Sequence, residues 1–294
     1  MDPAPLRPAR ARGAAPAVAD WLRRAEARGL ERFEAETLLA AALGRDRAWL
    51  YAHPEAVPSG AAGRCLARWI ARRGRGEPLA YLLGMQPFRG LPIAVGPAVL
   101  IPRPETEELV DLALAMLAGR RAPRVLELGT GSGAVAVALA RERADARIVA
   151  TELCPRALAV ARRNAARLAP GRIDFRCGDW YRPVAGERFD LIVANPPYVA
   201  AGDPALVAGE LRHEPRLALA GGADGLASLR AVVDGAPAHL AAQGSLVVEH
   251  GADQGPAVRA LLARAGFVEV RTHRDLAGRE RFAAGVLTVS SGTR

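Results

Sequence analysis

The sequence predicts an α/β protein with a small all-helical N-terminal domain and a larger domain built on a mostly parallel sheet. Up to about Arg75, apolar residues recur every three or four positions, which is typical of amphipathic helices. Glycine and proline at turn spacing then interrupt residues 87–99 and favour a β-hairpin. After Arg120, short apolar strands alternate with helices, and this alternation indicates a parallel sheet with helices on both faces.

These observations divide the 294 residues into four segments. We expect a disordered tail over residues 1–16, a helical domain over 17–84, a β-hairpin linker over 85–104 and the α/β domain over 105–294. A chain of this length allows about two domains and can bury a large core without disulfides or metal.

In the helical domain, Trp21, Leu22, Leu38 and Leu39 belong to one apolar stripe that runs to Gly44. Further helices are expected over residues 47–51 and 63–73, with Gly74 and Gly76 ending the second. The α/β domain is expected to begin with a helix over residues 106–118 whose first turn holds two acids. Its strands are predicted at 124–128, 147–153, 173–176, 189–194, 245–249, 267–273 and 281–289, and its other helices at 132–143, 155–168, 225–240 and 256–265.

Composition excludes several classes of protein. Half of the residues are hydrophobic and 24% are charged, which is an ordinary globular balance rather than that of a disordered chain. No run of 18 apolar residues occurs, so no membrane span is expected. The three cysteines, Cys65, Cys154 and Cys177, are widely spaced, which disfavours a disulfide framework or a zinc cluster and fits a cytoplasmic protein.

The net charge of +9 comes entirely from arginine, because the chain has no lysine. Residues 1–75 hold 14 of the 40 arginines against 8 acids, so most of the excess lies in the first quarter of the chain. Two interpretations stay open: an anionic partner such as nucleic acid or an acidic protein, or a coding bias that also explains the abundance of alanine, glycine and proline.

A glycine-rich turn joins the first predicted strand of the α/β domain to its helix. In Glu127-Leu-Gly-Thr-Gly-Ser-Gly-Ala, the glycines let the backbone turn sharply and approach a ligand. The next strand ends in Glu152, which can accept hydrogen bonds from ribose hydroxyls. Together these features predict an adenosine-containing ligand. The spacing of Gly129, Gly131 and Gly133 differs from the dinucleotide pattern and resembles the S-adenosylmethionine loop of Rossmann-like methyltransferases.

The tetrapeptide Asn195-Pro196-Pro197-Tyr198 follows the strand predicted over residues 189–194. Because ligands bind at the carboxyl ends of parallel strands, we expect it to face the same crevice as the glycine loop. The two prolines lack N–H donors. Their carbonyls and the Asn195 side-chain oxygen would form a patch of acceptors suited to a planar –NH2 group, and Tyr198 could stack on that group.

The tetrapeptide resembles the motif of methyltransferases that act on amide or exocyclic amine nitrogens, and the flanking segments are similar to one family of them. The segments that resemble release-factor glutamine N5-methyltransferases are Glu77-Pro-Leu-Ala-Tyr-Leu-Leu-Gly84, Leu100-Ile-Pro-Arg-Pro-Glu-Thr-Glu-Glu-Leu109, Gly178-Asp-Trp-Tyr, Glu214-Pro-Arg-Leu-Ala-Leu, Gly221-Gly-Ala-Asp-Gly225 and Asp275-Leu-Ala-Gly-Arg. The resemblance covers about residues 20–290 and implies a Rossmann-like S-adenosylmethionine-dependent domain.

This resemblance implies methylation of the glutamine side-chain amide in the Gly-Gly-Gln motif of peptide chain release factors, with the helical domain holding the protein substrate. It implies cofactor contacts at Gly129, Thr130, Gly131, Ser132, Gly133, Glu152, Trp180 and Asn195. Substrate contacts would come from Asn195, Pro196, Pro197 and Tyr198, of which Asn195, Pro196 and Tyr198 are the expected catalytic residues.

Glu127 and Asp179 have two interpretations, orienting the cofactor or shaping a turn at a strand end. At Glu249-His250-Gly the chain departs from the more apolar step expected of the family, and we assign no function to His250. The histidines lack ligand spacing, so no metal site is predicted.

Three alternative functions remain at this stage. The same tetrapeptide and a basic surface would serve an adenine N6-methyltransferase acting on DNA or RNA. A sister family modifies a glutamine of a ribosomal protein, and Pro104-Glu-Thr-Glu favours the release-factor branch. A non-enzymatic nucleic-acid-binding protein with a vestigial pocket is the third alternative. We expect a monomer that requires neither nucleic acid nor membrane.

Overall fold

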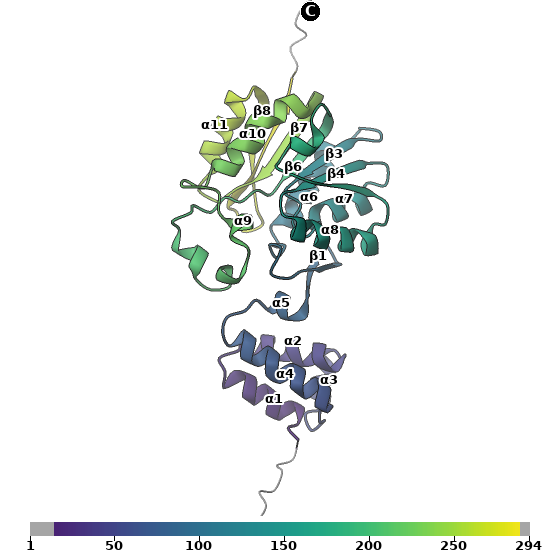
Figure 1. Cartoon of the computed structure of the whole chain (residues 1–294), viewed down its shortest axis with the longest axis vertical. Helices are drawn as coiled ribbons and strands as arrows, with labels where there is room; N and C mark the ends of the chain where they lie inside the picture. Colours follow the sequence, from purple (N-terminus) through teal and green to yellow (C-terminus); the bar gives the residue numbers. More distant parts are fainter. Residues whose placement is uncertain (1–14, 289–294) are drawn as a thin grey trace, which may run out of the picture. The chain divides into compact units, whose positions relative to one another are not determined.

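The computed structural model describes residues 15–288 of the chain. Contacts divide these residues into two compact units, one ending at Leu83 and the other beginning at Gly84 (Figure 1). Nearly all of the segment that we expect to be disordered, residues 1–16, lies outside the described residues.

The N-terminal unit is helical, as its periodicity predicts. Trp21, Leu39, Leu66 and Ile70 meet in one buried cluster that joins its helices. Ser59 caps the last long helix by accepting a hydrogen bond from the amide of Ala62, so that helix begins three residues earlier than predicted. The helices are α1 (Val18–Glu26), α2 (Arg32–Leu43), α3 (Arg47–Ala52), α4 (Gly60–Arg73) and α5 (Leu79–Leu83).

Several arginines of this unit are partners of its own acids. The buried carboxylate of Glu36 accepts hydrogen bonds from Arg32 and Arg47. Arg72 pairs with Glu77, and Arg73 pairs with Glu34. Part of the basic excess in the first quarter of the chain therefore contributes to the structure of the helical unit.

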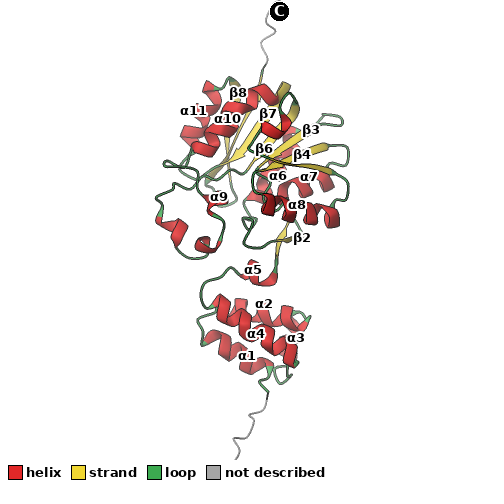
Figure 2. Ribbon diagram, in the orientation of Figure 1, coloured by secondary structure: helices red, strands yellow, loops and turns green. Residues whose placement is uncertain are grey.

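The larger unit opens with a β-hairpin and contains a seven-stranded sheet (Figure 2). The hairpin strands β1 (Met85–Phe88) and β2 (Leu91–Ala94) pair antiparallel. The sheet order is β5-β4-β3-β6-β7-β9-β8, in which β9 is antiparallel to both of its neighbours and the other pairs are parallel. The predicted α/β class and mostly parallel sheet are confirmed. The strands are β3 (Arg124–Leu128), β4 (Arg147–Glu152), β5 (Ile173–Cys177), β6 (Phe189–Ala194), β7 (Leu240–Glu249), β8 (Phe267–Arg274) and β9 (Glu280–Leu287).

Helices cover both faces of this sheet. The first group packs together on one face and consists of α6 (Thr106–Met116), α7 (Ala134–Glu142) and α8 (Pro155–Leu168). The second group, on the other face, consists of α10 (Ala227–His239) and α11 (Gly255–Arg264). Residues 134–140 of α7 are all buried, because that helix lies between the sheet and its neighbours and is apolar on every side.

The structure differs from the sequence prediction where local pattern is weak. Strand β7 begins at Leu240 rather than at Ser245, because Leu240 pairs with Phe189 of β6 before the ladder shifts register. Gln243 adopts φ of 59° at this irregularity, which the alternation of apolar residues does not signal. Five short elements also were not predicted, namely α5, η1 (Arg182–Val184), η2 (Pro204–Val207), η3 (Leu211–His213) and α9 (Arg216–Leu219).

The topology gathers polar strand ends at one edge. Strands β3, β4, β6 and β7 are parallel, so their carboxyl ends meet at the edge of the sheet where ligands bind in folds of this kind. The glycine loop follows β3, Glu152 ends β4, Asn195 follows β6 and Glu249 ends β7.

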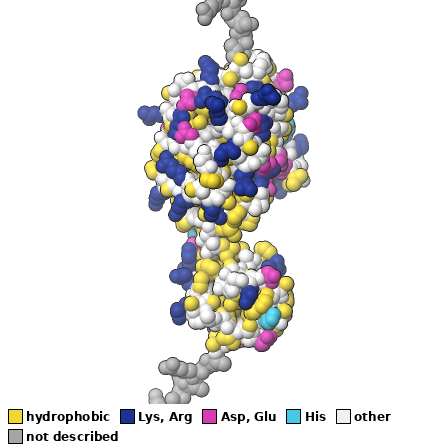
Figure 3. Space-filling model, turned by 90° about the vertical axis from the view of Figure 1, so that its right-hand side faces the viewer, with side chains coloured by type: hydrophobic (Ala, Val, Ile, Leu, Met, Phe, Trp, Pro, Cys, Tyr) yellow, Lys and Arg dark blue, Asp and Glu magenta, His cyan; other side chains and the backbone are white. Residues whose placement is uncertain are grey.

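Arginine side chains on the face of the larger unit in Figure 3 are spread out and interleaved with acidic ones rather than gathered in one patch. The ion pairs of the larger unit include Arg124 with Glu187 and Arg120 with Asp190. The view therefore offers no concentrated basic surface of the kind that tracks a nucleic-acid backbone.

Candidate active site

The glycine loop after β3 is folded by its own residues. Gly129, Gly131 and Gly133 have φ of 69°, 56° and 80°, which side chains with a Cβ rarely adopt. Glu127 Oε2 accepts a hydrogen bond from the Thr130 hydroxyl at 2.5 Å and from the Ala136 amide at 3.1 Å. Burial raises the pKa of Glu127 to about 8. Of the two interpretations of Glu127, these contacts favour the structural one, shaping the turn.

Glu152 lies across this loop and joins it to the next strand. Its Oε2 accepts from the Gly131 amide at 2.9 Å, and its Oε1 accepts from the Cys154 amide at 2.8 Å. Each carboxylate oxygen has a further lone pair. Glu152 is therefore held in place by the backbone and still has acceptor capacity for a ligand hydroxyl.

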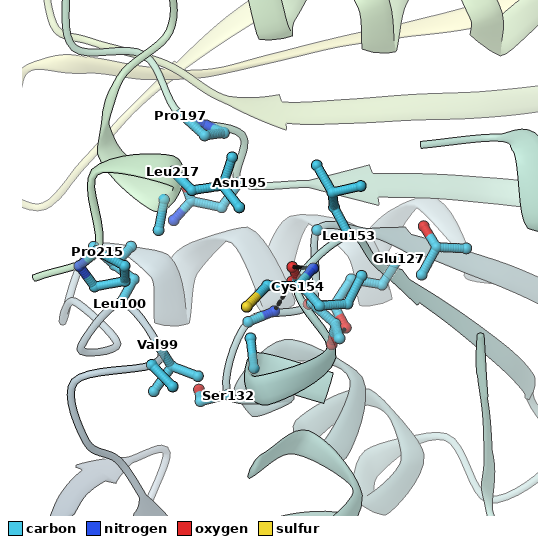
Figure 4. A pocket seen from close by; sticks show the side chains of 18 of the residues that line it. Val99, Leu100, Glu127, Ser132, Leu153, Cys154, Asn195, Pro197, Pro215 and Leu217 are labelled. Atoms are coloured by element: carbon cyan, nitrogen blue, oxygen red, sulfur yellow. Dashed lines mark hydrogen bonds between the residues drawn. The ribbon is translucent and has the colours of Figure 1, made fainter. Parts of the chain in front are cut away.

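A cavity of about 600 Å³ opens at this strand edge, within the size range of small-molecule sites. Figure 4 shows Asn195, Pro197 and Leu217 close together on one side, with Leu153 and Glu127 on the other. Four of the five predicted loop residues line the cavity, and Gly133 does not. Glu152, Asp179 and Trp180 line it as well. The Trp180 ring reaches within 3.5 Å of the point where a Cβ on Gly129 would lie. Thr151 also lines the cavity, and its hydroxyl is buried without a hydrogen-bond partner among the described residues.

These residues fit a nucleoside ligand such as S-adenosylmethionine. The carboxylate of Glu152 suits a diol, Trp180 offers a flat apolar face, and the Thr151 hydroxyl has unused hydrogen-bonding capacity.

Asn195 is half-buried at the end of β6, and its Nδ2 donates to the Thr106 hydroxyl at 3.2 Å. Asn195 and Pro197 line the cavity, whereas Pro196 is buried and neither Pro196 nor Tyr198 is among the lining residues. The Tyr198 hydroxyl instead points to Glu249, with 3.3 Å between the oxygens. The structure thus brings Asn195 and Pro197 to the cofactor loop and directs Tyr198 behind them.

Two glycines let the Asn195–Tyr198 turn pack closely against the segment of residues 221–225. A Cβ on Gly221 would lie 2.5 Å from the carbonyl oxygens of both Pro197 and Gly225. A Cβ on Gly225 would meet the Tyr198 carbonyl at the same distance. The Gly221-Gly-Ala-Asp-Gly225 segment therefore permits a backbone approach that larger residues would prevent.

A further wall of the cavity is formed by residues 100–103 and 214–217. These two segments are distant in the sequence, and Glu214 joins them. Its buried carboxylate accepts from the Ile101 amide at 3.0 Å and from the Arg103 guanidinium. Leu100 and Pro102 on one segment and Pro215 and Leu217 on the other line the cavity. The exposed fraction of the Leu217 side chain is 56%, so this wall presents apolar surface at the cavity.

Sequence reasoning assigned no role to Thr106, Glu214 or Glu249. The sequence pattern predicts Thr106 only as the start of a helix, and it gives Glu214 no function of its own. The strand-end rule states that ligands bind at the carboxyl ends of parallel strands. Glu249 ends such a strand, as Glu152 does, so this rule also indicates Glu249.

Among residues 15–288, no cluster of His, Cys, Asp and Glu side chains is arranged to hold a metal ion. Within the same part of the chain, every helix is too short or too polar to cross a lipid bilayer.

Comparison with known protein families gives two matches. Residues 17–84 match the PrmC N-terminal domain, and residues 108–272 match the methyltransferase small domain.

Individual relatives agree with these matches. The chain is 52% identical over 263 residues to the release factor glutamine methyltransferase of Bordetella pertussis, covering 88% of this chain and 96% of that protein. It is 50% identical over 256 residues to the release factor glutamine methyltransferase of Xylella fastidiosa, covering 87% and 93%. A methyltransferase structure from Pyrococcus furiosus shares the fold, with a TM-score of 0.51, 20% identity and coverage of 68% of this chain and 90% of that one.

Proposed function

The chain belongs to the family of release factor glutamine methyltransferases, and from that premise we propose how its residues perform the reaction. In this proposal, the enzyme methylates the side-chain amide nitrogen of the glutamine in the Gly-Gly-Gln motif of peptide chain release factors. The methyl donor is S-adenosylmethionine, whose sulfonium supplies an already activated methyl group when bound.

The observation that carries the proposal is the orientation of the Asn195 side chain. Because Asn195 Nδ2 donates to Thr106, its Oδ1 is the amide atom left for a ligand. Asn195 lines the same cavity as the glycine loop and Glu152. An acceptor beside a nucleoside site suits a substrate that presents an –NH2 group.

An amide nitrogen is a poor nucleophile because its lone pair is delocalised into the carbonyl. Asn195 Oδ1 and the Pro196 carbonyl would accept the two N–H groups of the substrate glutamine, fixing its position and favouring a pyramidal nitrogen. Tyr198, whose hydroxyl is directed toward Glu249, would act from behind these acceptors by holding the turn that carries them. The chain therefore contributes orientation and electrostatics, and orientation alone can supply about 7–11 kcal/mol of a barrier.

On the cofactor side, Gly129, Thr130, Gly131, Ser132 and Gly133 would bind the methyl donor, with Glu152 on the ribose hydroxyls, Trp180 along the adenine and Asn195 nearby. The Gly131 and Cys154 amides donate to Glu152, and this supports its role, because a lone pair is left on each carboxylate oxygen. The helical domain would bind the release factor, and the protein would act as a monomer without nucleic acid.

The test is incubation of the full chain with labelled S-adenosylmethionine and either a release factor or nucleic acid. We expect label in the release factor, and none after a Gln→Ala change in its Gly-Gly-Gln motif. Label in DNA or RNA alone would instead support an adenine N6-methyltransferase. Label in a ribosomal protein alone would support the sister specificity.

A further inference from the structure

We infer that Glu249 is a positioning residue for this reaction: through Thr106 it determines which atom of the Asn195 amide faces the cavity, and it also holds the Tyr198 hydroxyl. The inference rests on the proposed function, because it concerns the atom that would accept the glutamine N–H.

The geometry places one buried carboxylate behind two side chains of the Asn195–Tyr198 motif. Glu249 is the last residue of β7, and only 1% of its surface is exposed. Its Oε2 accepts from the Thr106 hydroxyl at 2.8 Å, and its Oε1 accepts from the Tyr198 hydroxyl at 3.3 Å. Thr106 in turn lies 3.2 Å from Asn195 Nδ2. A hydrogen-bonded chain therefore runs from Glu249 through Thr106 to Asn195.

This chain has one arrangement of protons when Glu249 is ionised. A carboxylate only accepts, so the single hydroxyl hydrogen of Thr106 must go to Glu249. The Thr106 oxygen is then left as an acceptor, and it can bond only the N–H side of the Asn195 amide. Asn195 Oδ1 consequently faces the ligand.

A neutral group at Glu249 removes this restriction. A protonated carboxyl or a glutamine amide can donate to Thr106, which frees the Thr106 hydrogen for Asn195 Oδ1. Asn195 would then turn its –NH2 group toward the cavity and oppose the –NH2 group of the substrate.

Protonation of Glu249 falls in an accessible pH range. Burial raises the pKa of Glu249 to about 7, against the opposing hydrogen bond from Thr106 and the charge of Arg281 on β9. Tyr198 also donates to Glu249 and lowers its pKa, while Glu105, just before α6, raises it. We therefore expect methyl transfer to weaken as pH falls through about 7.

The experiment compares methyl transfer to a release factor by the wild type and Glu249→Gln between pH 6 and pH 9. At pH 8 we expect kcat of the variant to be about 10- to 100-fold lower, the scale of a misdirected catalytic hydrogen bond. The KM for the release factor and the Kd for S-adenosylmethionine should change less than kcat does. The wild-type loss of kcat at low pH should be absent from the variant, whose kcat stays uniformly low.

Thr106 provides a second, independent variant. Thr106→Val should reproduce the loss of kcat, and Thr106→Ser, which restores the hydroxyl, should recover most of it. Ser245→Ala is the matched control, because Ser245 is a buried polar residue on the same strand outside the hydrogen-bonded chain. It should keep the wild-type kcat.

Wild-type kcat at pH 8 in Glu249→Gln, or an acid limb that persists in it, would overturn the inference. If circular dichroism shows that Glu249→Gln is unfolded, the Thr106→Val and Thr106→Ser pair decides in the same way. A wild-type enzyme that transfers no methyl group to any release factor would overturn the proposed function instead.

Discussion

The two sides of the cavity are held by contacts of very different reach along the chain. On the side of the glycine loop, Glu127 bonds Thr130 and Ala136, three and nine residues away. On the side of Asn195, Thr106 bonds Glu249, 143 residues away, and Ile101 bonds Glu214, 113 residues away. One side is a strand-turn-helix segment that folds on itself, and the other forms only when distant segments assemble.

This difference predicts that the two proposed functions of the site, cofactor binding and substrate positioning, can be separated by mutation. In the proposed function, cofactor binding depends on the glycine loop and Glu152. Holding the substrate amide, as proposed, would require in addition that α6, β6, β7 and the 211–221 segment be in register. Changes on the Asn195 side should therefore lower kcat while leaving cofactor affinity intact, and changes at Glu152 should do the reverse.

The largest effect is expected for Asn195→Ala, which removes the proposed acceptor from the cavity. Loss of one preorganised hydrogen-bonding group typically costs about 10²- to 10³-fold in kcat. Cofactor affinity, measured by calorimetry, should change little. An Asn195→Ala enzyme with near-normal turnover would contradict the acceptor role and the separation of the two sides.

The next effect is expected for Gly221→Ala, which acts on the same side through the backbone. The new Cβ would lie 2.5 Å from the Pro197 carbonyl, so the turn carrying Asn195 must shift. We expect a destabilisation of about 1–3 kcal/mol in urea unfolding and a loss of turnover.

Gly202→Ala is the control for this change. No atom lies within 4 Å of a Cβ there, and Gly202 has no positive φ, so stability and turnover should stay near wild type. Equal behaviour of the two variants would contradict the close approach at Gly221.

A smaller effect, on cofactor affinity and not mainly on turnover, is expected for Glu152→Gln. The amide would present a donor to one of the two backbone N–H groups that Glu152 now accepts, at Gly131 or Cys154. We expect the Kd for S-adenosylmethionine to rise about tenfold, the scale of one lost hydrogen bond to a charged group. At saturating cofactor, kcat should change less than it does in Asn195→Ala. An unchanged Kd would contradict the proposed role of Glu152 in binding the cofactor.

The last prediction concerns the pH dependence of stability, on which turnover does not depend directly. The pKa of Glu127 is raised to about 8 in the folded protein by burial, so the folded state holds a proton that the unfolded chain releases near its ordinary pKa of 4.5. Stability should therefore be greatest below pH 4.5 as far as this group is concerned, and it should fall as pH rises to about 8.

Urea unfolding at several pH values between 5 and 8 measures this dependence. Glu127→Gln, which cannot ionise, should flatten it, while part of the slope should remain from Glu249. Parallel slopes in the wild type and the variant would show that Glu127 does not titrate in this range.

The strand-end rule shows how far sequence reasoning reaches. Applied to Glu152 and Asn195, it located two residues that the structure brings to one cavity. Glu249 satisfies the same rule, but it stands in an apolar run where a carboxylate looks like an exception, and its partners are 143 and 51 residues away. The sequence pattern also does not predict that β7 begins at Leu240. That strand is extended by pairing with Phe189, which is distant in the chain, and not by local alternation of apolar residues.

By itself, the sequence determined the α/β class, the order of most strands and helices, and the glycine loop with Glu152. Those features depend on periodicity, glycine conformation and hydrogen bonds between residues close in the chain. Tertiary structure decided the direction of the Asn195 amide, the burial of Pro196, the turning of Tyr198 toward Glu249 and the close approach at Gly221. Each of these depends on which distant atoms a packed sheet brings within hydrogen-bonding or van der Waals distance, and no local pattern encodes that.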